Sequence, residues 1–196
     1  MTEVVIRFVE GAEREVALKL EERIFREENY PYDYRRFDEQ SRVFAAFIDG
    51  ACVGVLRVIA QSPLLPPVLE DCDVWDIGEW QAMGEKFAEL GTQAVLEEYR
   101  HSGVGLSLIR AAYVDARLRG LVALAVITEP ENVDFLNNTA NFACRQIGGV
   151  GFKGWECAPY IHVFSEVEVK LAAADPGSYA WFTEGIPDDL LAVPRS

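Results

Sequence analysis

The chain of 196 residues lacks the runs that mark several classes of protein. No apolar run approaches the roughly 20 residues that are needed to span a bilayer. Residues 1–10 alternate in polarity, and they lack the basic start and apolar centre of a signal peptide. These absences predict a cytoplasmic protein with no membrane partner.

Histidine and cysteine are scarce and scattered. The two histidines, His101 and His162, are far apart, and no two of the four cysteines form a Cys-x-x-Cys pair. Metal sites need such ligands at short, regular spacing, so we expect no metal. Free thiols also agree with a reducing compartment.

Basic residues are few in relation to acidic ones. The chain has 18 Lys and Arg against 32 Asp and Glu, which gives a net charge of −14. Binding to nucleic acid requires clustered cations that neutralise phosphates, so we expect no nucleic-acid partner. The excess of carboxylates is typical of a solvated acidic surface.

Size and hydropathy indicate one packed domain. Half of the residues are hydrophobic, and 196 residues are enough for one buried core plus a tail. We expect a domain over residues 1–170 and a tail over residues 171–196 that packs on it through aromatic side chains such as Tyr179 and Trp181.

Hydrophobic periodicity predicts an α/β (α+β) fold in the order β-α-β-β-β-α-β-α-β-β. The expected strands lie near residues 4–8, 43–48, 51–59, 86–96, 121–127, 150–155 and 160–169, and the expected helices span 12–28, 106–118 and 132–147. The dipeptide Asp49-Gly50 predicts a hairpin between the second and third strands. Residues 61–84 are expected to be irregular, and so long a loop is usually functional.

The most informative stretch joins the fourth strand to the second helix and reads Glu-Glu-Tyr-Arg-His-Ser-Gly-Val-Gly. Main-chain amides at a helix start lack partners, and the helix dipole gives them partial positive charge. Gly103 and Gly105 let phosphate oxygens approach those amides, and Arg100 adds a cation. We expect a pyrophosphate-bearing cofactor here. The alternative is a turn whose glycines only redirect the chain.

Spacing distinguishes this loop from other phosphate loops. No lysine follows, as a mononucleotide P-loop requires, and Leu108 replaces the third glycine of a dinucleotide fingerprint. The remaining pattern, Arg100-x-x-Gly103-x-Gly105, resembles the coenzyme A loop of the GNAT N-acyltransferase superfamily. This resemblance assigns the diphosphate of CoA to residues Arg100, His101, Ser102, Gly103, Val104 and Gly105.

A second motif agrees with the first. The superfamily's second cofactor helix reads Asn-x-x-Ala-x-x-aromatic-Tyr-x-x-x-Gly-Phe, and Asn137, Ala140 and Gly148 fall at matching spacings. The resemblance implies a single mixed central sheet, mostly antiparallel, with helices on both faces. It also places Asn137 at the cofactor. The tyrosine position, which often protonates the departing thiolate, holds Cys144, which is either the proton donor or an ordinary buried cysteine.

The N-terminal half resembles a narrower branch, the acyl-homoserine-lactone synthases and long-chain N-acyl amino acid synthases. The resemblance rests on Arg23-Ile-Phe, on the acidic loop around Asp38 and on Gly54-Val-Leu-Arg57. In those relatives the fourth strand begins Glu-x-Ser-Arg. Here Glu89 matches the Glu, and Thr92 replaces the Arg.

The resemblance also implies roles on the fourth strand. Main-chain groups of Ala94 and Val95 would bond the pantetheine arm in a slot beside the glycine loop. Glu89 is the candidate general base, because a carboxylate in an apolar slot accepts a proton more readily. The alternatives are that Glu89 is an ordinary exposed strand glutamate, or that Glu79 or Glu85 is the base.

Three residues are candidates for the substrate pocket. Arg57 lies in an apolar run and needs a partner, which is either an acidic substrate group or an internal carboxylate of Asp38 or Glu89. Tyr32 and Trp80 lie in aromatic segments that form either an apolar pocket or a cap on the core.

The leading hypothesis is therefore an N-acyltransferase that moves an acyl group from acyl-CoA to the amine of a small molecule. The second is a synthase of the acyl-homoserine-lactone or N-acyl amino acid type that uses an acyl carrier protein, although two acidic proteins would repel each other. The third is a non-catalytic module that binds CoA or a partner. A homodimer is compatible with the sequence.

Overall fold

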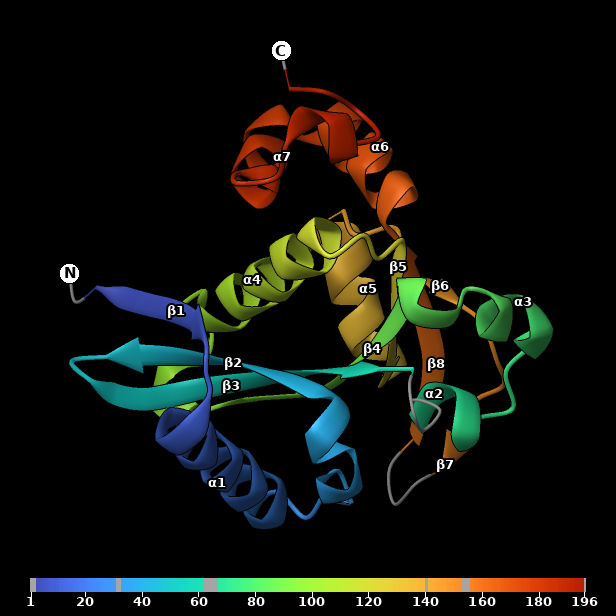
Figure 1. Ribbon diagram of the computed structural model, residues 1–196. Helices are drawn as coiled ribbons and strands as arrows, with labels where there is room; N and C mark the ends of the chain where they lie inside the picture. Colours follow the sequence, from blue (N-terminus) through green and yellow to red (C-terminus); the bar gives the residue numbers. More distant parts are fainter. Residues whose placement is uncertain (1–2, 31–32, 62–66, 140, 153–155, 196) are drawn as a thin grey trace. The chain divides into compact units, whose positions relative to one another are not determined.

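The computed structural model describes residues 3–30, 33–61, 67–139, 141–152 and 156–195 (Figure 1). The chain forms two compact units: unit 1 comprises Met1–Ile59 and Leu90–Tyr113, and unit 2 comprises Ala60–Glu89 and Val114–Ser196. The division into residues 1–170 and a tail of residues 171–196 stays a prediction, and its boundary falls within helix α6 (Phe164–Ala174).

Unit 1 is built around a three-stranded meander that continues into β4. Its elements are β1 (Val4–Phe8), α1 (Gly11–Glu27), η1 (Arg35–Gln40), β2 (Ser41–Ile48), β3 (Ala51–Ala60), the larger part of β4 (Phe87–Val95), η3 (Glu97–Tyr99) and the first part of α4 (Val104–Leu118). The turn between β2 and β3 has positive φ at both central residues, 50° at Asp49 and 80° at Gly50. This geometry suits a two-residue hairpin, as the sequence predicted.

The core of unit 1 lies between α1 and one face of its strands (Figure 1). Ala17, Leu20 and Ile24 recur at helical spacing on α1, and they pack with Val55 of β3. Gly54 points to the other face, where an added Cβ would lie 3.2 Å from Leu108 and Val104 of α4. Helices therefore cover both faces of the strands in unit 1.

Unit 2 combines short helices with a second group of strands. Its elements are α2 (Pro67–Glu70), α3 (Ile77–Ala82), η2 (Gly84–Lys86), the start of β4, the end of α4, β5 (Ala123–Thr128), α5 (Pro130–Thr139), β6 (Arg145–Gln146), β7 (Gly151–Phe152), β8 (Glu156–Val163), α6, α7 (Pro176–Thr183) and η4 (Asp188–Leu190). Its core joins Val68, Trp80, Ala125 and Ile161.

The strand order is β1-β2-β3-β4-β5-β8-β6, and β7 pairs with β8 beside this path. The ladders β1–β2, β2–β3, β5–β8, β6–β8 and β7–β8 are antiparallel. The predicted mixed and mostly antiparallel sheet with helices on its faces is confirmed. Among the described residues, no helix combines the length and the hydropathy that a membrane span requires.

Three predictions about elements are wrong. Residues 61–84 were expected to be irregular, and they contain the short helices α2 and α3. The helix expected over residues 132–147 ends at Thr139, because Asn141 and Ala143 take positive φ and residues 145–146 pair with β8 instead. The strand expected over residues 160–169 ends at Val163, where α6 begins. Phe164, Val167 and Leu171 then recur at helical spacing on its buried face.

Candidate active site

The glycine turn connects η3 to α4 in unit 1. The amide of Ser107 donates to the carbonyl of Gly103 at 3.0 Å, and this is the first bond of the α4 ladder. The amides of residues 103–106 precede that bond, so they have no acceptor within the helix. Gly103 has a φ of 89° and His101 one of 59°, and these left-handed conformations turn the chain into the helix. The turn can present main-chain donors to an anion.

The turn is also bonded to its surroundings. Gln93 of β4 donates through Nε2 to the carbonyl of Gly105 at 2.7 Å, and an added Cβ at Gly105 would lie 3.2 Å from the same nitrogen. The Ser102 hydroxyl donates to the carbonyl of Tyr99 at 2.5 Å. Both bonds end on main-chain carbonyls, and neither uses an amide of residues 103–106.

The guanidinium of Arg100 contacts β4 and the residue that follows α1. Its Nε donates to the carbonyl of Val95 at 3.0 Å, and its Nη2 forms an ion pair with Glu28. The Val95 carbonyl, which the resemblance assigns to the pantetheine arm, therefore already accepts a bond. Ala94 is buried beside it. The cofactor roles of Ala94, Val95 and residues 100–105 stay predictions.

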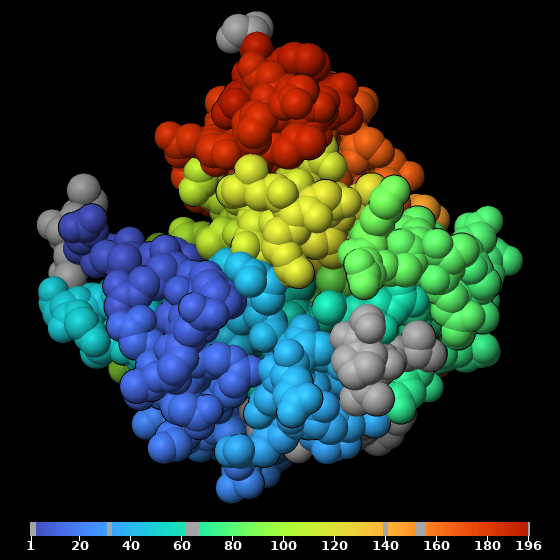
Figure 2. Space-filling model, viewed as in Figure 1, coloured from blue at the N-terminus to red at the C-terminus, as the bar shows by residue number. Residues whose placement is uncertain are grey.

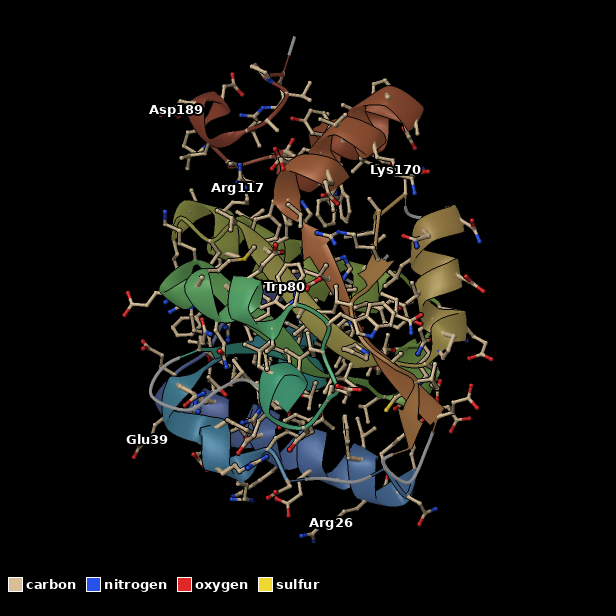
Figure 3. All side chains as sticks on the ribbon, turned by 90° about the vertical axis from the view of Figure 1, so that its right-hand side faces the viewer. Arg26, Glu39, Trp80, Arg117, Lys170 and Asp189 are labelled. Atoms are coloured by element: carbon tan, nitrogen blue, oxygen red, sulfur yellow. The ribbon has the colours of Figure 1, made fainter. Side chains whose placement is uncertain are left out.

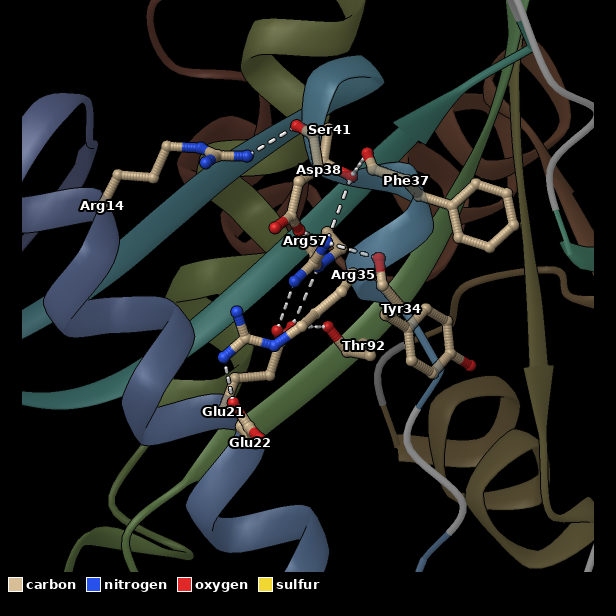
Figure 4. A network of polar contacts seen from close by, with 10 residues as sticks. All are labelled: Arg14, Glu21, Glu22, Tyr34, Arg35, Phe37, Asp38, Ser41, Arg57 and Thr92. Carbon is tan, nitrogen blue, oxygen red and sulfur yellow. Dashed lines mark hydrogen bonds and ion pairs between the residues drawn. The ribbon is translucent and has the colours of Figure 1, made fainter.

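Unit 1 also contains a buried charge network (Figure 4). Arg57 and Glu21 are both fully buried, and two bonds join them, Nε to Oε1 at 3.2 Å and Nη2 to Oε2 at 2.5 Å. The Thr92 hydroxyl donates to the same carboxylate. Two charges at this depth are compatible with stability only when each is paired and hydrogen-bonded.

The remaining guanidinium nitrogen of Arg57, Nη1, contacts the η1 segment and the residue before it (Figure 4). Its Nη1 donates to Asp38 Oδ1 at 2.6 Å and to the carbonyl of Tyr34 at 3.0 Å. The internal pair with Asp38 is therefore present. A substrate carboxylate that used Arg57 would have to displace Asp38, whose side chain is 30% exposed. The substrate role of Arg57 stays a prediction that now requires this exchange.

Glu89, the candidate base, lies at the unit 2 end of β4 and is fully buried. Its Oε2 accepts the backbone amide of Val68 at 2.7 Å, near the start of α2. A carboxylate at a helix start is favourably placed against the helix dipole. Glu89 of β4 therefore stabilises the start of α2, independently of any role in proton transfer.

Cys144 lies in unit 2 with its Sγ 3.3 Å from His162 Nδ1. Burial raises the pKa of the Cys144 thiol to about 12 and lowers the pKa of His162 to about 4. Both groups are thus neutral near pH 7. A thiol that ionises so reluctantly is a weak proton donor, which favours the buried-cysteine alternative.

The Asn137 side chain of α5 bonds to the backbone of Cys144 in the segment that follows the helix. Its Oδ1 accepts the amide of Cys144 at 2.6 Å, and its Nδ2 donates to the carbonyl of the same residue at 2.9 Å. The side chain thus completes a local turn. Its assignment to the cofactor stays a prediction.

Of the two aromatic candidates, Trp80 is among the described residues and Tyr32 is not. Trp80 is buried, packs against Phe87 with ring centroids 6.5 Å apart, and donates its indole N–H to the carbonyl of Trp75 at 2.9 Å (Figure 3). It behaves as a core residue of unit 2. Tyr32 lies outside the described residues.

The surface of unit 1 carries an open hollow that is lined by residues of α1 and η1. Figure 2 shows the surfaces of these two elements, dark blue and lighter blue, next to each other. It measures about 470 Å³ and is lined by Lys19, Glu22, Arg23, Arg26, Glu27 and Arg35. Glu22 pairs with both Arg26 and Arg35, and Arg23 lies 4.0 Å from Glu27. Four cations therefore face two carboxylates, and the lining carries a net positive charge. Within the described ranges, no group of His, Cys, Asp and Glu has an arrangement suited to a metal ion.

Sequence reasoning missed two carboxylates. Glu21 follows Ala17 by four residues and precedes Ile24 by three, so it lies on the buried face of α1. A charge at that spacing was the available signal for a partner such as Arg57. Glu28 gave no comparable signal, because its contact with Arg100 joins residues 72 positions apart.

Several solved structures share this fold. FeeM, an N-acyl amino acid synthase from uncultured soil microbes, has a TM-score of 0.73 at 18% identity, over 87% of this chain and 96% of that chain. The ribosomal-protein-S18-alanine N-acetyltransferase from Escherichia coli has a TM-score of 0.56 at 14% identity, over 82% and 94% of the two chains. A Bacillus subtilis acetyltransferase in complex with CoA has a TM-score of 0.53 at 14% identity, over 82% and 99%.

Such low identities establish the fold alone, and no match was found among curated proteins. Family membership comes from the sequence itself. A model of the Acetyltransferase (GNAT) family matches residues 13–137, which is more than half of the 196 residues. The chain therefore belongs to the GNAT family of acetyltransferases.

Proposed function

We propose that the protein moves an acyl group from acyl-CoA to the amine of a small molecule. The observation that carries this proposal is the turn into α4, where Gly103 takes a left-handed conformation and four main-chain amides precede the first helical bond. Such a helix start binds phosphate oxygens through its amides and its dipole. CoA would supply the thioester and the diphosphate, and residues 100–105 with Arg100 would hold the latter.

The reaction requires a proton to leave the amine and another to reach the thiolate. Glu89 is the proposed acceptor of the first proton as the amine nitrogen bonds to the acyl carbon and the C–S bond breaks. The thiolate that leaves takes the second proton from water. Cys144 is a weak candidate for that donation, because the pKa of its thiol, about 12, lies well above the ordinary range of thiols.

Binding of CoA is the first test. We expect CoA to raise the melting temperature by linkage. Gly103→Val should abolish this shift, because a β-branched side chain resists the φ of 89°. Gly120→Val is the matched control: its φ of 79° imposes similar backbone strain, and as at Gly103 no atom lies within 4 Å of an added Cβ. Absence of any shift in the wild type would reject the proposal.

Turnover is the second test. Release of free thiol from acyl-CoA thioesters of several lengths, measured against a panel of amines and amino acids, should identify an acceptor. We expect Glu89→Gln to bind CoA like the wild type and to lose at least about 100-fold in kcat, as expected for loss of a general base. Unchanged kcat in Glu89→Gln would remove Glu89 from the chemistry.

The second candidate is a synthase that takes its acyl group from a carrier protein. It is favoured by the likeness to FeeM, whose TM-score of 0.73 is accompanied by coverage of 96% of that chain. An acylated carrier protein should then form a complex at low salt and replace acyl-CoA as donor. A complex without turnover from either donor would indicate a non-catalytic module. For either enzyme, free cysteines agree with a cytoplasmic location.

A further inference from the structure

The arginine of the loop that is proposed to hold the diphosphate is already paired with a carboxylate of the protein, that of Glu28. Arg100 is the only Lys or Arg among residues 97–106. Its guanidinium contacts Glu28 through Nη2 and the carbonyl of Val95 through Nε, and both side chains of the ion pair are partly exposed, at 39% and 36%. A diphosphate at the α4 start would have to recruit Arg100 away from Glu28.

The position of Glu28 is unfavourable for α1 itself. Glu28 is the residue at the C-terminal end of the helix, where its amide bonds to the carbonyl of Ile24 at 3.0 Å. A carboxylate at a helix C-terminus opposes the negative end of the dipole. The stability of α1 does not explain a glutamate there, whereas a partnership with Arg100 does.

The charges along the turn make this partnership consequential. Glu97 and Glu98 begin η3, so the segment carries two carboxylates before its single arginine. With Arg100 neutralised by Glu28, an approaching diphosphate meets a net negative segment and must rely on the main-chain amides. Once Arg100 turns from Glu28 to the diphosphate, its guanidinium can form charge-assisted hydrogen bonds with the anion directly, although the summed charge of the segment and Glu28 is unchanged.

We propose that Glu28 competes with the cofactor's diphosphate for Arg100, so that binding of the cofactor releases the C-terminal end of α1. This inference rests on the proposed function. The backbone that follows Glu28 is defined by Asn29, which has a φ of 59°, and by a bond from the amide of Tyr30 to the carbonyl of Phe25 at 2.9 Å. The exchange thus links the glycine turn to the start of the aromatic segment that leads to η1.

The test measures the Kd of CoA for the full chain by calorimetry in five proteins: wild type, Glu28→Gln, Glu27→Gln, Arg100→Gln and the Glu28→Gln/Arg100→Gln double variant. We expect Glu28→Gln to lower the Kd by about two- to fivefold at an ionic strength of about 0.15 M, the range of a partly exposed ion pair. Glu27→Gln is the control, because it removes the same charge from the same helix end, and its own pair with Arg23 is long at 4.0 Å. It should leave the Kd within about 1.5-fold of the wild type, because an exposed charge without direct contact is largely screened.

The double variant isolates the competition. Removal of Glu28 should bring no gain once Arg100 is absent, so the double variant should match Arg100→Gln, and the gain in Glu28→Gln should shrink at 0.5 M NaCl. An equal or higher Kd in Glu28→Gln than in the wild type would mean that Glu28 only braces Arg100, and would overturn the inference while leaving the proposed function intact. A wild type that binds no CoA would instead overturn the proposed function.

Discussion

At the scale of single residues, the buried Glu21–Arg57 ion pair stands out, because desolvation of its two charges must be offset by contacts inside the protein. Both side chains are fully buried, and each lone pair or proton must find a partner inside the protein. Thr92 and Asp38 complete the set, and the arginine reaches the η1 segment through the carbonyl of Tyr34. The pair therefore fixes how α1, β3 and η1 meet.

We expect Arg57→Met to lower the free energy of unfolding by about 3–5 kcal/mol, because it leaves the Glu21 carboxylate buried without its counter-ion. The double variant Glu21→Gln/Arg57→Met should recover more than half of this loss. Urea unfolding measures both values.

The control is Arg7→Met, which breaks the exposed pair with Glu13 at 2.6 Å. Its cost should stay below about 1 kcal/mol. A loss of similar size in Arg57→Met and Arg7→Met would show that burial of the Glu21–Arg57 pair has no energetic consequence.

The buried His162 makes the protein sensitive to acid. Its pKa falls from 6.5 to about 4 in the folded state, because burial disfavours the imidazolium. The unfolded chain binds this proton first, so the contribution of His162 is complete above pH 6.5 and is lost as the pH falls toward 4.

The loss from this one group should be about 2 kcal/mol at pH 5 and roughly 3 kcal/mol below pH 4. His162→Phe, which cannot titrate, should reduce the fall in the free energy of unfolding between pH 7 and pH 5 by about that amount. Equal pH slopes in the wild type and the variant would contradict a buried neutral imidazole.

At the scale of elements, one close backbone contact in unit 2 joins the segment before α3 to the segment after β6. In unit 2, Val74 forms a bridge with Gly148, while the amide of Gly149 bonds to the carbonyl of Asp73 at 3.2 Å. An added Cβ at Gly148 would lie 2.5 Å from that carbonyl and 2.5 Å from Pro159. Only glycine allows this approach.

We expect Gly148→Ala to destabilise the protein by about 1–3 kcal/mol, because the clash is with backbone and cannot be relieved by a rotamer change. Gly149→Ala is the neighbouring control, since an added Cβ there has no atom within 4 Å. It should be neutral or stabilising by up to about 1 kcal/mol. Thermal unfolding of the two variants tests this, and similar melting temperatures would count against the bridge.

Local signals predicted the elements that local physics decides. Asp49-Gly50 encodes its own positive φ values, and Ala17 and Ile24 encode the face that α1 buries. The end of α5 was not predictable in this way. It depends on Asn137, which reaches seven residues forward to Cys144, and on positive φ at Asn141 and Ala143, where the sequence has no glycine.

The site was predictable to the same degree. The glycine turn follows from residue types in a row, and the structure has the expected strand, turn and helix there. The partners of Arg57 and Arg100 come from segments 36 and 72 residues away, so they depend on how α1 packs. Asp38 was foreseen, whereas Glu21 and Glu28 were not.

At the scale of the whole molecule, charge is the dominant property. A net charge of −14 over 196 residues creates self-repulsion that favours expanded states. We expect the melting temperature to rise by several degrees, about 2–5 °C, between 20 mM and 0.5 M NaCl, because salt screens this repulsion. Potassium chloride should give the same curve, which excludes a specific sodium site. A falling melting temperature would show that ion pairs outweigh the repulsion.

The hydrogen bond between Glu89 and Val68 offers a way to observe the chemistry without substrate. A carboxylate that accepts a main-chain N–H at 2.7 Å polarises it strongly while ionised and much less once protonated. The nitrogen and proton resonances of Val68 should therefore move as Glu89 gains or loses its proton. One backbone signal of the nitrogen-15-labelled protein would then record the protonation state of Glu89 throughout a pH titration.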